Sequence, residues 1–435
     1  MPTDGALKRD VRLIDVVTLG AGAAIGVAMF SIFSPAVQLA GPAMLVSLVL
    51  AAVPMALFAV VYAFLGSAVP SSGAAFVWQT RFLHPFVGFI IAWTRILGSV
   101  GVMVVLALVL VQHWTMLVPL PLKPTMLIVF VVFYLLNLFG ISIAARVQTL
   151  LFCLMGALLL GLVALGLPAI DSAHFEPFMP RGWLGLFAAI PLLVSLFLGI
   201  ESATEVGDEI RDARRVIARG IAISVGVTLV IYCALSVVVV GTVDRATLGA
   251  STTPLLLAAE RVMGPYASYF IILAATLAIT KSLNAILIIF SRYLFAMARS
   301  GMLPGALARV HARWGTPHVA LTVAFACCVL GLLMPMNLVF LFLAVNIPTM
   351  LKYFASCLAA LRVVGRHGHV YDDAGFKPGK GLLRVLSIAG ALCALAIIAV
   401  GVEADWRPYV VLSVWALAGV LYWCARPRAV AGEVS

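Results

Sequence analysis

The chain has 435 residues, of which 64% are hydrophobic and only 10% charged, and its mean hydropathy is +1.16. A soluble domain has about 25% charged residues, so this composition excludes a water-soluble globular protein and predicts a chain with lipid as its solvent. The net charge of +11 does not indicate a nucleic-acid partner, because the basic residues gather in loops on one side of the predicted membrane.

Long apolar runs between polar or Pro/Gly breaks predict an all-α polytopic membrane protein with about twelve transmembrane helices. Their expected limits, in chain order, are 13–38, 42–68, 86–112, 122–143, 147–169, 183–206, 216–241, 266–297, 318–336, 338–363, 383–401 and 407–425. Two further segments, 70–83 and 253–262, are expected to form short helices at opposite membrane interfaces.

The basic residues predict the orientation of these spans. With both termini on one side, the segments on that side contain Lys8, Arg9, Arg12, Arg81, Arg146, Arg211, Arg214, Arg215, Arg219, Arg299, Arg309, Arg313, Arg362, Arg366, Lys377, Lys380, Arg384, Arg426 and Arg428. The opposite segments contain only Lys123, Arg181, Arg245, Arg261 and Arg407. The positive-inside rule therefore predicts a multi-pass protein of the cytoplasmic membrane with both termini cytoplasmic.

The sequence contains none of the usual motifs of an ATP-driven pump or an enzyme. No nucleotide-binding, kinase or protease motif occurs, and the seven cysteines lie in apolar stretches without zinc spacing. The histidines fall at span ends or in loops, which disfavours a membrane-embedded catalytic centre: His84, His113, His174, His311, His318, His367 and His369. Neither a metal site nor a cofactor is expected. A channel would need a repeated pore-lining pattern, and none is visible.

Two spans contain features that predict interrupted helices. The first has three glycines within seven residues, Gly20, Gly22 and Gly26, each of which weakens a helix by about 1 kcal/mol. Close helix packing through small residues is the alternative explanation. The sixth span has Gly199 two residues before Glu201, a carboxylate within apolar sequence.

Breaks in the first and sixth of twelve spans are typical of inverted-repeat transporters. Free N–H groups at such a break can bind a substrate carboxylate, and free carbonyl groups can bind an ammonium. An amino acid zwitterion would fit both. The expected substrate-binding residues are Gly22, Ala23, Ala24, Ile25, Gly26, Val27, Ala28, Phe197, Gly199, Ile200 and Glu201.

Three stretches resemble the amino acid–polyamine–organocation (APC) superfamily of permeases. They are the Gly-rich segment 22–30, the segment 197–214 with its Phe-Leu-Gly-Ile-Glu sequence, and the segment 291–304, Ser-Arg-Tyr-Leu-Phe-Ala-Met-Ala-Arg-Ser-Gly-Met-Leu-Pro, with Gly-Thr-Pro at 315–317. One departure is Ala28, where family members usually have glycine. Its methyl group and the bulk of Val27 would either narrow the pocket or alter how the ligand carboxylate is held.

The resemblance implies the leucine-transporter fold, with five plus five inverted helices, two extra helices and alternating access. The expected organisation is a cytoplasmic tail (1–12), a first half (13–169), a second half (183–363), two further helices (383–425) and a second cytoplasmic tail (426–435). It also implies amino acids, polyamines or related organic cations as substrates.

Among the acidic residues, Glu201 alone is expected deep in the membrane, while Glu205 is placed near the cytoplasmic end of its span. An ionisable residue in lipid costs about 2.5–3.5 kcal/mol on insertion scales, so function is the first hypothesis for it. Contact with a substrate ammonium and transfer of a coupling proton are the two candidate roles. A structural pair or a cap of the broken helix is the alternative.

Lys281 lies near the middle of span eight, between Thr280 and the nearby Asn284. Sodium-coupled members of the related fold place hydroxyl ligands on this helix, so the Lys281 ammonium could replace a sodium ion. Transport would then be sodium-independent, and either proton-coupled or an exchange. A salt bridge with Glu201 or a snorkelling side chain is an equal alternative.

Three other cations and two aromatic residues are candidates for gating or packing. Arg95 is about 14 Å into span three, Arg292 is expected to snorkel at the inner end of span eight, and Lys352 follows Pro348 in span ten. Trp93 and Phe197 could stack over a ligand, although packing is the commoner role. Glu201, Lys281, Thr280, Asn284 and Arg95 are the candidate coupling and gating residues.

The primary prediction is a secondary transporter of an amino acid or related amine, with the substrate, a proton and membrane lipids as its expected partners. A polyamine or organic-cation permease, and a transporter-like sensor without turnover, remain open alternatives.

Overall fold

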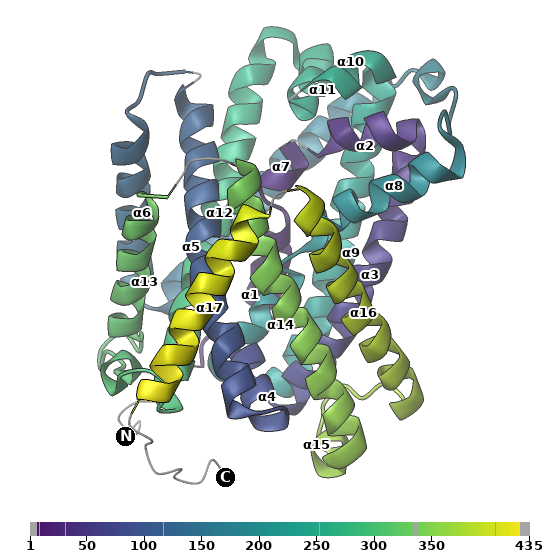
Figure 1. The fold of residues 1–435 in the computed structure, drawn as a ribbon. Helices are drawn as coiled ribbons and strands as arrows, with labels where there is room; N and C mark the ends of the chain where they lie inside the picture. Colours follow the sequence, from purple (N-terminus) through teal and green to yellow (C-terminus); the bar gives the residue numbers. More distant parts are fainter. Residues whose placement is uncertain are drawn as a thin grey trace.

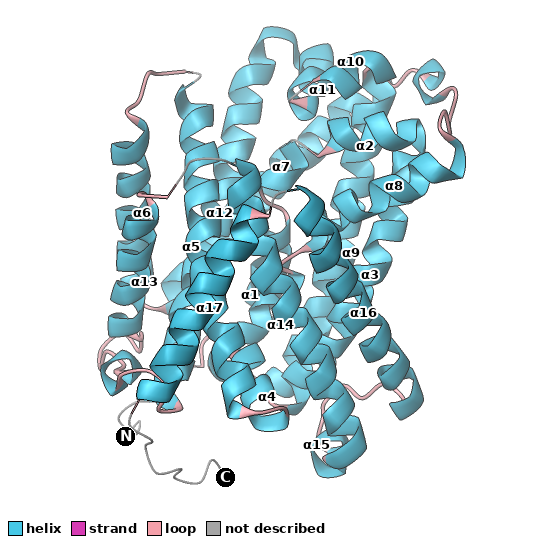
Figure 2. Ribbon diagram, viewed as in Figure 1, coloured by secondary structure: helices cyan, strands magenta, loops and turns pink. Residues whose placement is uncertain are grey.

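The computed structural model describes residues 7, 9–30, 32–115, 117–251, 253–334, 338–404 and 406–426. This part of the chain consists of helices joined by turns and loops, with no strands (Figure 2). Nine of its helical segments are long and apolar enough to cross a membrane, and three shorter apolar helices coincide with predicted spans one, four and nine. The all-α polytopic architecture is therefore confirmed.

The long helices follow the predicted spans closely. They are α3 (Met44–Ala68), α5 (Pro85–Thr115), α6 (Leu122–Leu138), α7 (Ile141–Gly166), α9 (Ala213–Thr242), α12 (Ala267–Arg299), α13 (His318–Gly331), α14 (Leu338–Arg366), α16 (Lys380–Ala404) and α17 (Arg407–Ala425). Because apolar side chains are stable in lipid as well as in the protein core, many large ones remain exposed on this bundle, such as Ile128 and Val230.

The short helices mark the two ends of the molecule. In Figure 1, α4 (Ala74–Phe82) and α15 (Gly368–Asp372) lie at the lower end, while α10 (Arg245–Ala250) and α11 (Pro254–Met263) lie at the upper end. The predicted interfacial segments 70–83 and 253–262 correspond to α4 and α11. Their positions at opposite ends agree with the sequence-based assignment to opposite interfaces.

The first and sixth predicted spans are both interrupted. The first consists of α1 (Leu13–Ala24), the 3₁₀ turn η1 (Val27–Phe30) and α2 (Phe33–Ala40). The sixth consists of α8 (Gly182–Val194) and three 3₁₀ segments, η5 (Ser195–Phe197), η6 (Ile200–Glu205) and η7 (Gly207–Glu209). α1 packs against η6, α9 and α12 in the middle of the bundle (Figure 1). The two breaks therefore meet at the centre of the fold.

Trp93 fastens the last helix to the bundle. Its indole N–H donates to the Trp415 carbonyl at 2.9 Å, and the Trp415 indole donates back to the Trp93 carbonyl at 2.8 Å. The two rings stack with centroids 4.9 Å apart. Trp93 was a candidate for stacking over a ligand, and its observed contacts instead give it a packing role between α5 and α17.

Candidate functional site

The first break frees backbone carbonyls in the centre of the molecule. In a continuous helix the Gly22 carbonyl would accept from the Gly26 N–H, but that N–H donates to Ala24 at 2.8 Å. Ile25 follows the last helical residue with φ −76° and ψ 80°, which is not helical. A Cβ at Gly22 would lie 2.5 Å from Gln148 Nε2, so any side chain there would have to displace the Gln148 amide.

Lys281 on α12 satisfies these carbonyls. Its Nζ donates to the Gly22 carbonyl at 2.6 Å and also to the Ile25 carbonyl, and Ser282 Oγ donates to Gly22 at 3.2 Å. Lys281 is fully buried. The Lys281 ammonium therefore occupies a position at the break where a metal cation could otherwise be coordinated by the same two carbonyl oxygens. It makes no salt bridge with Glu201, which was one of the alternatives.

The second break depends on Gly199. This residue has φ +103°, which a residue with a side chain rarely adopts, and a Cβ there would lie 3.1 Å from Ala23 Cβ. The preceding Leu198 is extended, with ψ 131°. Gly199 therefore lets the sixth span change direction while touching the end of α1, which places the two breaks in contact.

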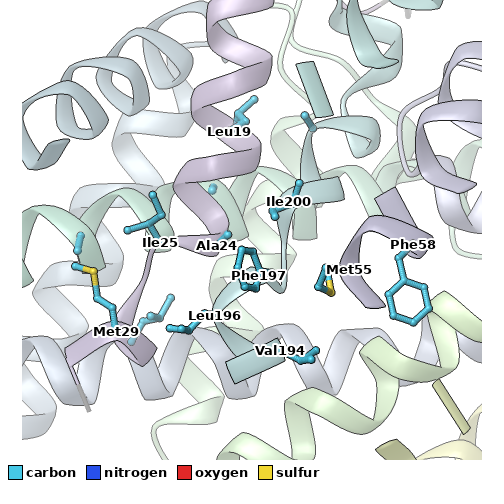
Figure 3. Close-up of a cluster of buried hydrophobic side chains, with 14 of the residues drawn as sticks. Leu19, Ala24, Ile25, Met29, Met55, Phe58, Val194, Leu196, Phe197 and Ile200 are labelled. Carbon is cyan, nitrogen blue, oxygen red and sulfur yellow. The ribbon is translucent and has the colours of Figure 1, made fainter. Parts of the chain in front are cut away.

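Part of the predicted binding segment forms core rather than site. Phe197, Ile25 and Ile200 are almost completely buried, and Figure 3 shows them within a cluster of apolar side chains around the two breaks. The Phe197 ring packs edge-on against Tyr232 with centroids 5.8 Å apart. Among the described residues, these three and Gly22 do not line the cavity described next, so a direct contact with substrate remains a prediction for each of them.

A cavity of about 590 Å³ opens beside the breaks. Of the predicted binding residues, it is lined by Ala23, Ala24, Gly26, Ala28, Gly199 and Glu201, while the side chain of Val27 lies outside the described part. Apolar residues of α5, α12 and α14 supply another part of its wall: Val102, Val105, Leu106, Ile286, Ile289 and Val345. Its size is in the range of about 300–1,000 Å³ that is usual for small-molecule sites.

Four ionisable side chains also line this cavity: Arg95, Glu201, Glu205 and Lys352. Lys352 Nζ donates to Glu201 Oε1 at 2.7 Å and lies 4.0 Å from Glu205 Oε1. Glu205 also accepts from the Tyr293 hydroxyl at 2.9 Å and from the Ala75 N–H at 3.4 Å. All four residues are buried. Glu205 ends the sixth apolar segment, Gly182–Glu205, as the sequence predicts, and both Glu201 and Glu205 are buried inside the protein.

The remaining coupling candidates divide between cavity and core. Arg95 lines the cavity and donates to the Thr349 hydroxyl at 2.7 Å. Asn284 is buried away from the cavity, donating to the Ala144 carbonyl at 3.0 Å, and Thr280 donates to its own helix at the Thr276 carbonyl. Neither Asn284 nor Thr280 is among the described lining residues, so their coupling role remains untested.

A buried ion pair and two backbone hydrogen bonds connect the chain before α1 with η7, Arg211 and α12. Arg292 Nε and Nη2 donate to the two Glu209 oxygens at 2.8 and 3.0 Å, and both residues are almost fully buried. The Val11 N–H donates to the Glu209 carbonyl at 3.0 Å, and the Arg211 N–H donates to the Val11 carbonyl at 2.9 Å. The expectation that Arg292 snorkels is wrong, because Glu209 neutralises it inside the protein.

We call this group of contacts around Val11, Glu209, Arg211 and Arg292 the lower seal. Sequence reasoning missed it because Glu209 is followed by a polar, arginine-rich loop and looks exposed. The available signal was that Glu209 and Arg292 both lie in stretches that resemble the same family.

The comparisons with known proteins agree with this geometry. Residues 12–423 match the family described as amino acid permease. The chain belongs to that family. This confirms the resemblance noted in the sequence and makes the protein a multi-pass membrane transporter of amino acids rather than an enzyme.

The names of similar proteins state different substrates. This permease is 28% identical to the branched-chain amino acid permease BcaP of Bacillus subtilis, over 96% of this chain and 92% of that protein. It is 26% identical to the methylthioribose transporter of the same organism, over 84% and 83%. It is 28% identical to the vacuolar cationic amino acid transporter 2 of Arabidopsis thaliana, over 82% and 60%. The substrate class of this permease therefore depends on the residues that line its own cavity.

Proposed function

We propose that this permease carries a neutral amino acid with an aliphatic side chain across the cytoplasmic membrane. The observation that carries the proposal is the charge balance of the cavity. When all four ionisable lining residues are ionised, Arg95 and Lys352 offset Glu201 and Glu205, and each carboxylate already has a partner. A cationic substrate or polyamine would need an excess of acidic groups, because a buried charge is stable only when it is paired.

The lining of the cavity supports an aliphatic side chain. Val102, Leu106, Ile286 and Ile289 contribute apolar surface, and burying a side chain such as that of leucine contributes about 1.5–3 kcal/mol. The zwitterionic part of the substrate would bind at the two breaks, where helix ends provide N–H and carbonyl groups. The name of the Bacillus subtilis relative, branched-chain amino acid permease, agrees with this substrate class.

The proposed mechanism is alternating access with the lower end cytoplasmic. The positive-inside pattern supports this orientation. Several cavity residues, including Pro35 and Leu192, come from the upper parts of the interrupted spans, whereas the lower seal closes the other direction. The state represented here would then face outward. We propose residues 13–169 and 183–363 as the two halves that move relative to each other.

Uptake into proteoliposomes tests the substrate class. We expect saturable uptake of labelled leucine, isoleucine or valine, with unlabelled members of this group competing. Lysine, arginine and putrescine should compete at least about tenfold less well, since a charged group left unpaired in the cavity costs more than about 1.4 kcal/mol. Preferential uptake of the cationic compounds would contradict the proposal. Specific binding without uptake would instead favour a sensor.

The position of Lys281 supports sodium-independent transport. Since its ammonium already binds the Gly22 and Ile25 carbonyls, we expect no loss of uptake when choline replaces sodium. The Lys281→Met variant leaves both carbonyls without this partner, and its uptake should fall at least about tenfold. Lys380→Met, which removes an exposed lysine at the start of α16, is the matched control. Stimulation of wild-type uptake by sodium would refute the proposal that the Lys281 ammonium takes the place of a sodium ion.

Proton co-transport is the coupling that we favour over exchange. Glu201 and Glu205 share one lysine, so a proton on one carboxylate would leave the other with the Lys352 ammonium. An acidic exterior should therefore increase the initial rate of uptake into vesicles that contain no amino acid. A rate that depends only on preloaded amino acid would support exchange instead.

A further inference from the structure

A second cavity, of about 480 Å³, lies beside the lower seal. It is lined by Asp10 and Arg12 just before α1, by Ile14 and Asp15 in its first turn, by Ala145, Arg146 and Thr149 on α7, and by Arg211 after η7. It is separate from the substrate cavity, since the two share no lining residue. Three arginines from three different segments therefore line one cavity.

The acidic residues of this cavity are already engaged. Asp10 Oδ1 accepts from Arg211 Nη2 at 3.0 Å. Asp15 accepts from the Arg12 backbone N–H at 2.9 Å and from the Thr149 hydroxyl at 3.2 Å. Among the described residues, the guanidinium groups of Arg12 and Arg146 have no hydrogen-bond or ion-pair partner. The cavity therefore has two free planar cations and a formal charge of +1, from three arginines and two aspartates.

We propose that this cavity binds the phosphate group of an anionic phospholipid from the inner leaflet. Arginine forms paired N–H bonds with phosphate oxygens, and guanidinium groups are more easily desolvated than ammonium groups. Ile14, at the edge of the cavity, is 54% exposed and offers an apolar contact for the adjoining acyl chain. In the proposed orientation the cavity is at the level of the cytoplasmic headgroups, where anionic lipids attract basic residues.

A bound headgroup would hold the lower seal closed. It would connect the start of α1 to α7 and to Arg211, whose backbone N–H bonds to Val11 within the seal. Inward opening has to separate these segments, so the lipid would slow that step. This consequence rests on the proposed alternating access, whereas binding of the lipid does not.

Native mass spectrometry of the purified full-length protein tests the binding. We expect phosphatidylglycerol to bind the wild type more tightly than phosphatidylcholine. The variant Arg12→Gln/Arg146→Gln should lose about tenfold or more in affinity for phosphatidylglycerol, because two basic side chains are removed from the headgroup. Arg219→Gln/Arg384→Gln removes two exposed arginines from α9 and α16 and should bind like the wild type.

Two further measurements make the result decisive. Inorganic phosphate should compete only weakly, because it has no acyl chain to contact Ile14; full competition at equal concentration would overturn the lipid assignment. In proteoliposomes, phosphatidylglycerol should reduce uptake by the wild type and leave uptake by the Arg12/Arg146 variant unchanged. The proposed lipid site would be overturned if both double variants bound phosphatidylglycerol equally well. It would also be overturned if the wild type showed no preference for phosphatidylglycerol over phosphatidylcholine. Because binding is read without transport, it can fail or succeed independently of the proposed function.

Discussion

Replacing Glu201 with glutamine is expected to abolish concentrative uptake while the protein still reaches the membrane. Glutamine keeps the size of the side chain but removes the charge that pairs with Lys352 at 2.7 Å. Leaving one partner of a buried ion pair unpaired costs about 3–5 kcal/mol. A structural role and a functional role of Glu201 therefore both predict a loss of uptake in this variant. A second variant is needed to distinguish them.

The double variant Glu201→Gln/Lys352→Met separates the two roles. It removes both charges of this pair, and Glu205 keeps its hydrogen bond from Tyr293, so thermal stability in detergent should recover most of the loss seen in either single variant. If Glu201 exchanges a proton or contacts substrate, uptake and its dependence on external pH remain absent despite this recovery. Recovery of wild-type uptake in the double variant would show that the pair is only structural.

Replacing Arg292 with glutamine should be the most damaging change at the lower seal. The substitution leaves Glu209 buried without its bidentate partner, at a cost of about 3–5 kcal/mol. The Glu209 backbone carbonyl also accepts the hydrogen bond from the Val11 N–H. Displacement of Glu209 should therefore open the lower seal more often. We expect uptake to fall at least about tenfold, since 1.4 kcal/mol corresponds to a factor of ten in an equilibrium.

Arg299 provides the matched control, because it lies two turns further along the same helix. It donates to Asp208 at 3.1 Å, but its side chain is 51% exposed, so the pair contributes no more than about 1 kcal/mol. Arg299→Gln should therefore keep near-normal uptake. Ser71 is buried, and its carbonyl accepts from the N–H of Gly207, the first residue of η7, at 3.2 Å. A cysteine introduced at this position should become more accessible to a cytoplasmic thiol reagent in the Arg292→Gln variant alone. Equal labelling in both variants would refute the sealing role.

The two helix breaks of the candidate site could be predicted from the sequence, because a glycine or a charged residue is conspicuous within a long apolar span. Glycines at positions 20, 22 and 26 and the pair Gly199 and Glu201 indicated both breaks, since glycine and carboxylate are each unfavourable inside an apolar helix. Lys281 was a candidate for the same reason. Its contact with the freed carbonyls agrees with one of the two roles that the sequence left open.

The partners of these charges could not be predicted in the same way. Glu201 pairs with Lys352, which is 151 residues away, and Glu209 pairs with Arg292, which is 83 residues away. A pairing over such distances depends on which helix faces meet, and the periodicity of one span contains no information about its neighbour. Arg292 looked peripheral because it is close to the end of its span along the chain, whereas its burial depends on the pairing with Glu209.

The sequence by itself determined the solvent, the helices and the two positions where helices break, because these follow from transfer free energies and backbone preferences of individual segments. Only the tertiary structure decided which charges neutralise one another. Packing decided that Lys281 binds the first break, that Lys352 lies between two glutamates, and that Arg292 pairs with Glu209. The physical reason is that a buried charge is stabilised by whichever partner the fold brings within about 4 Å.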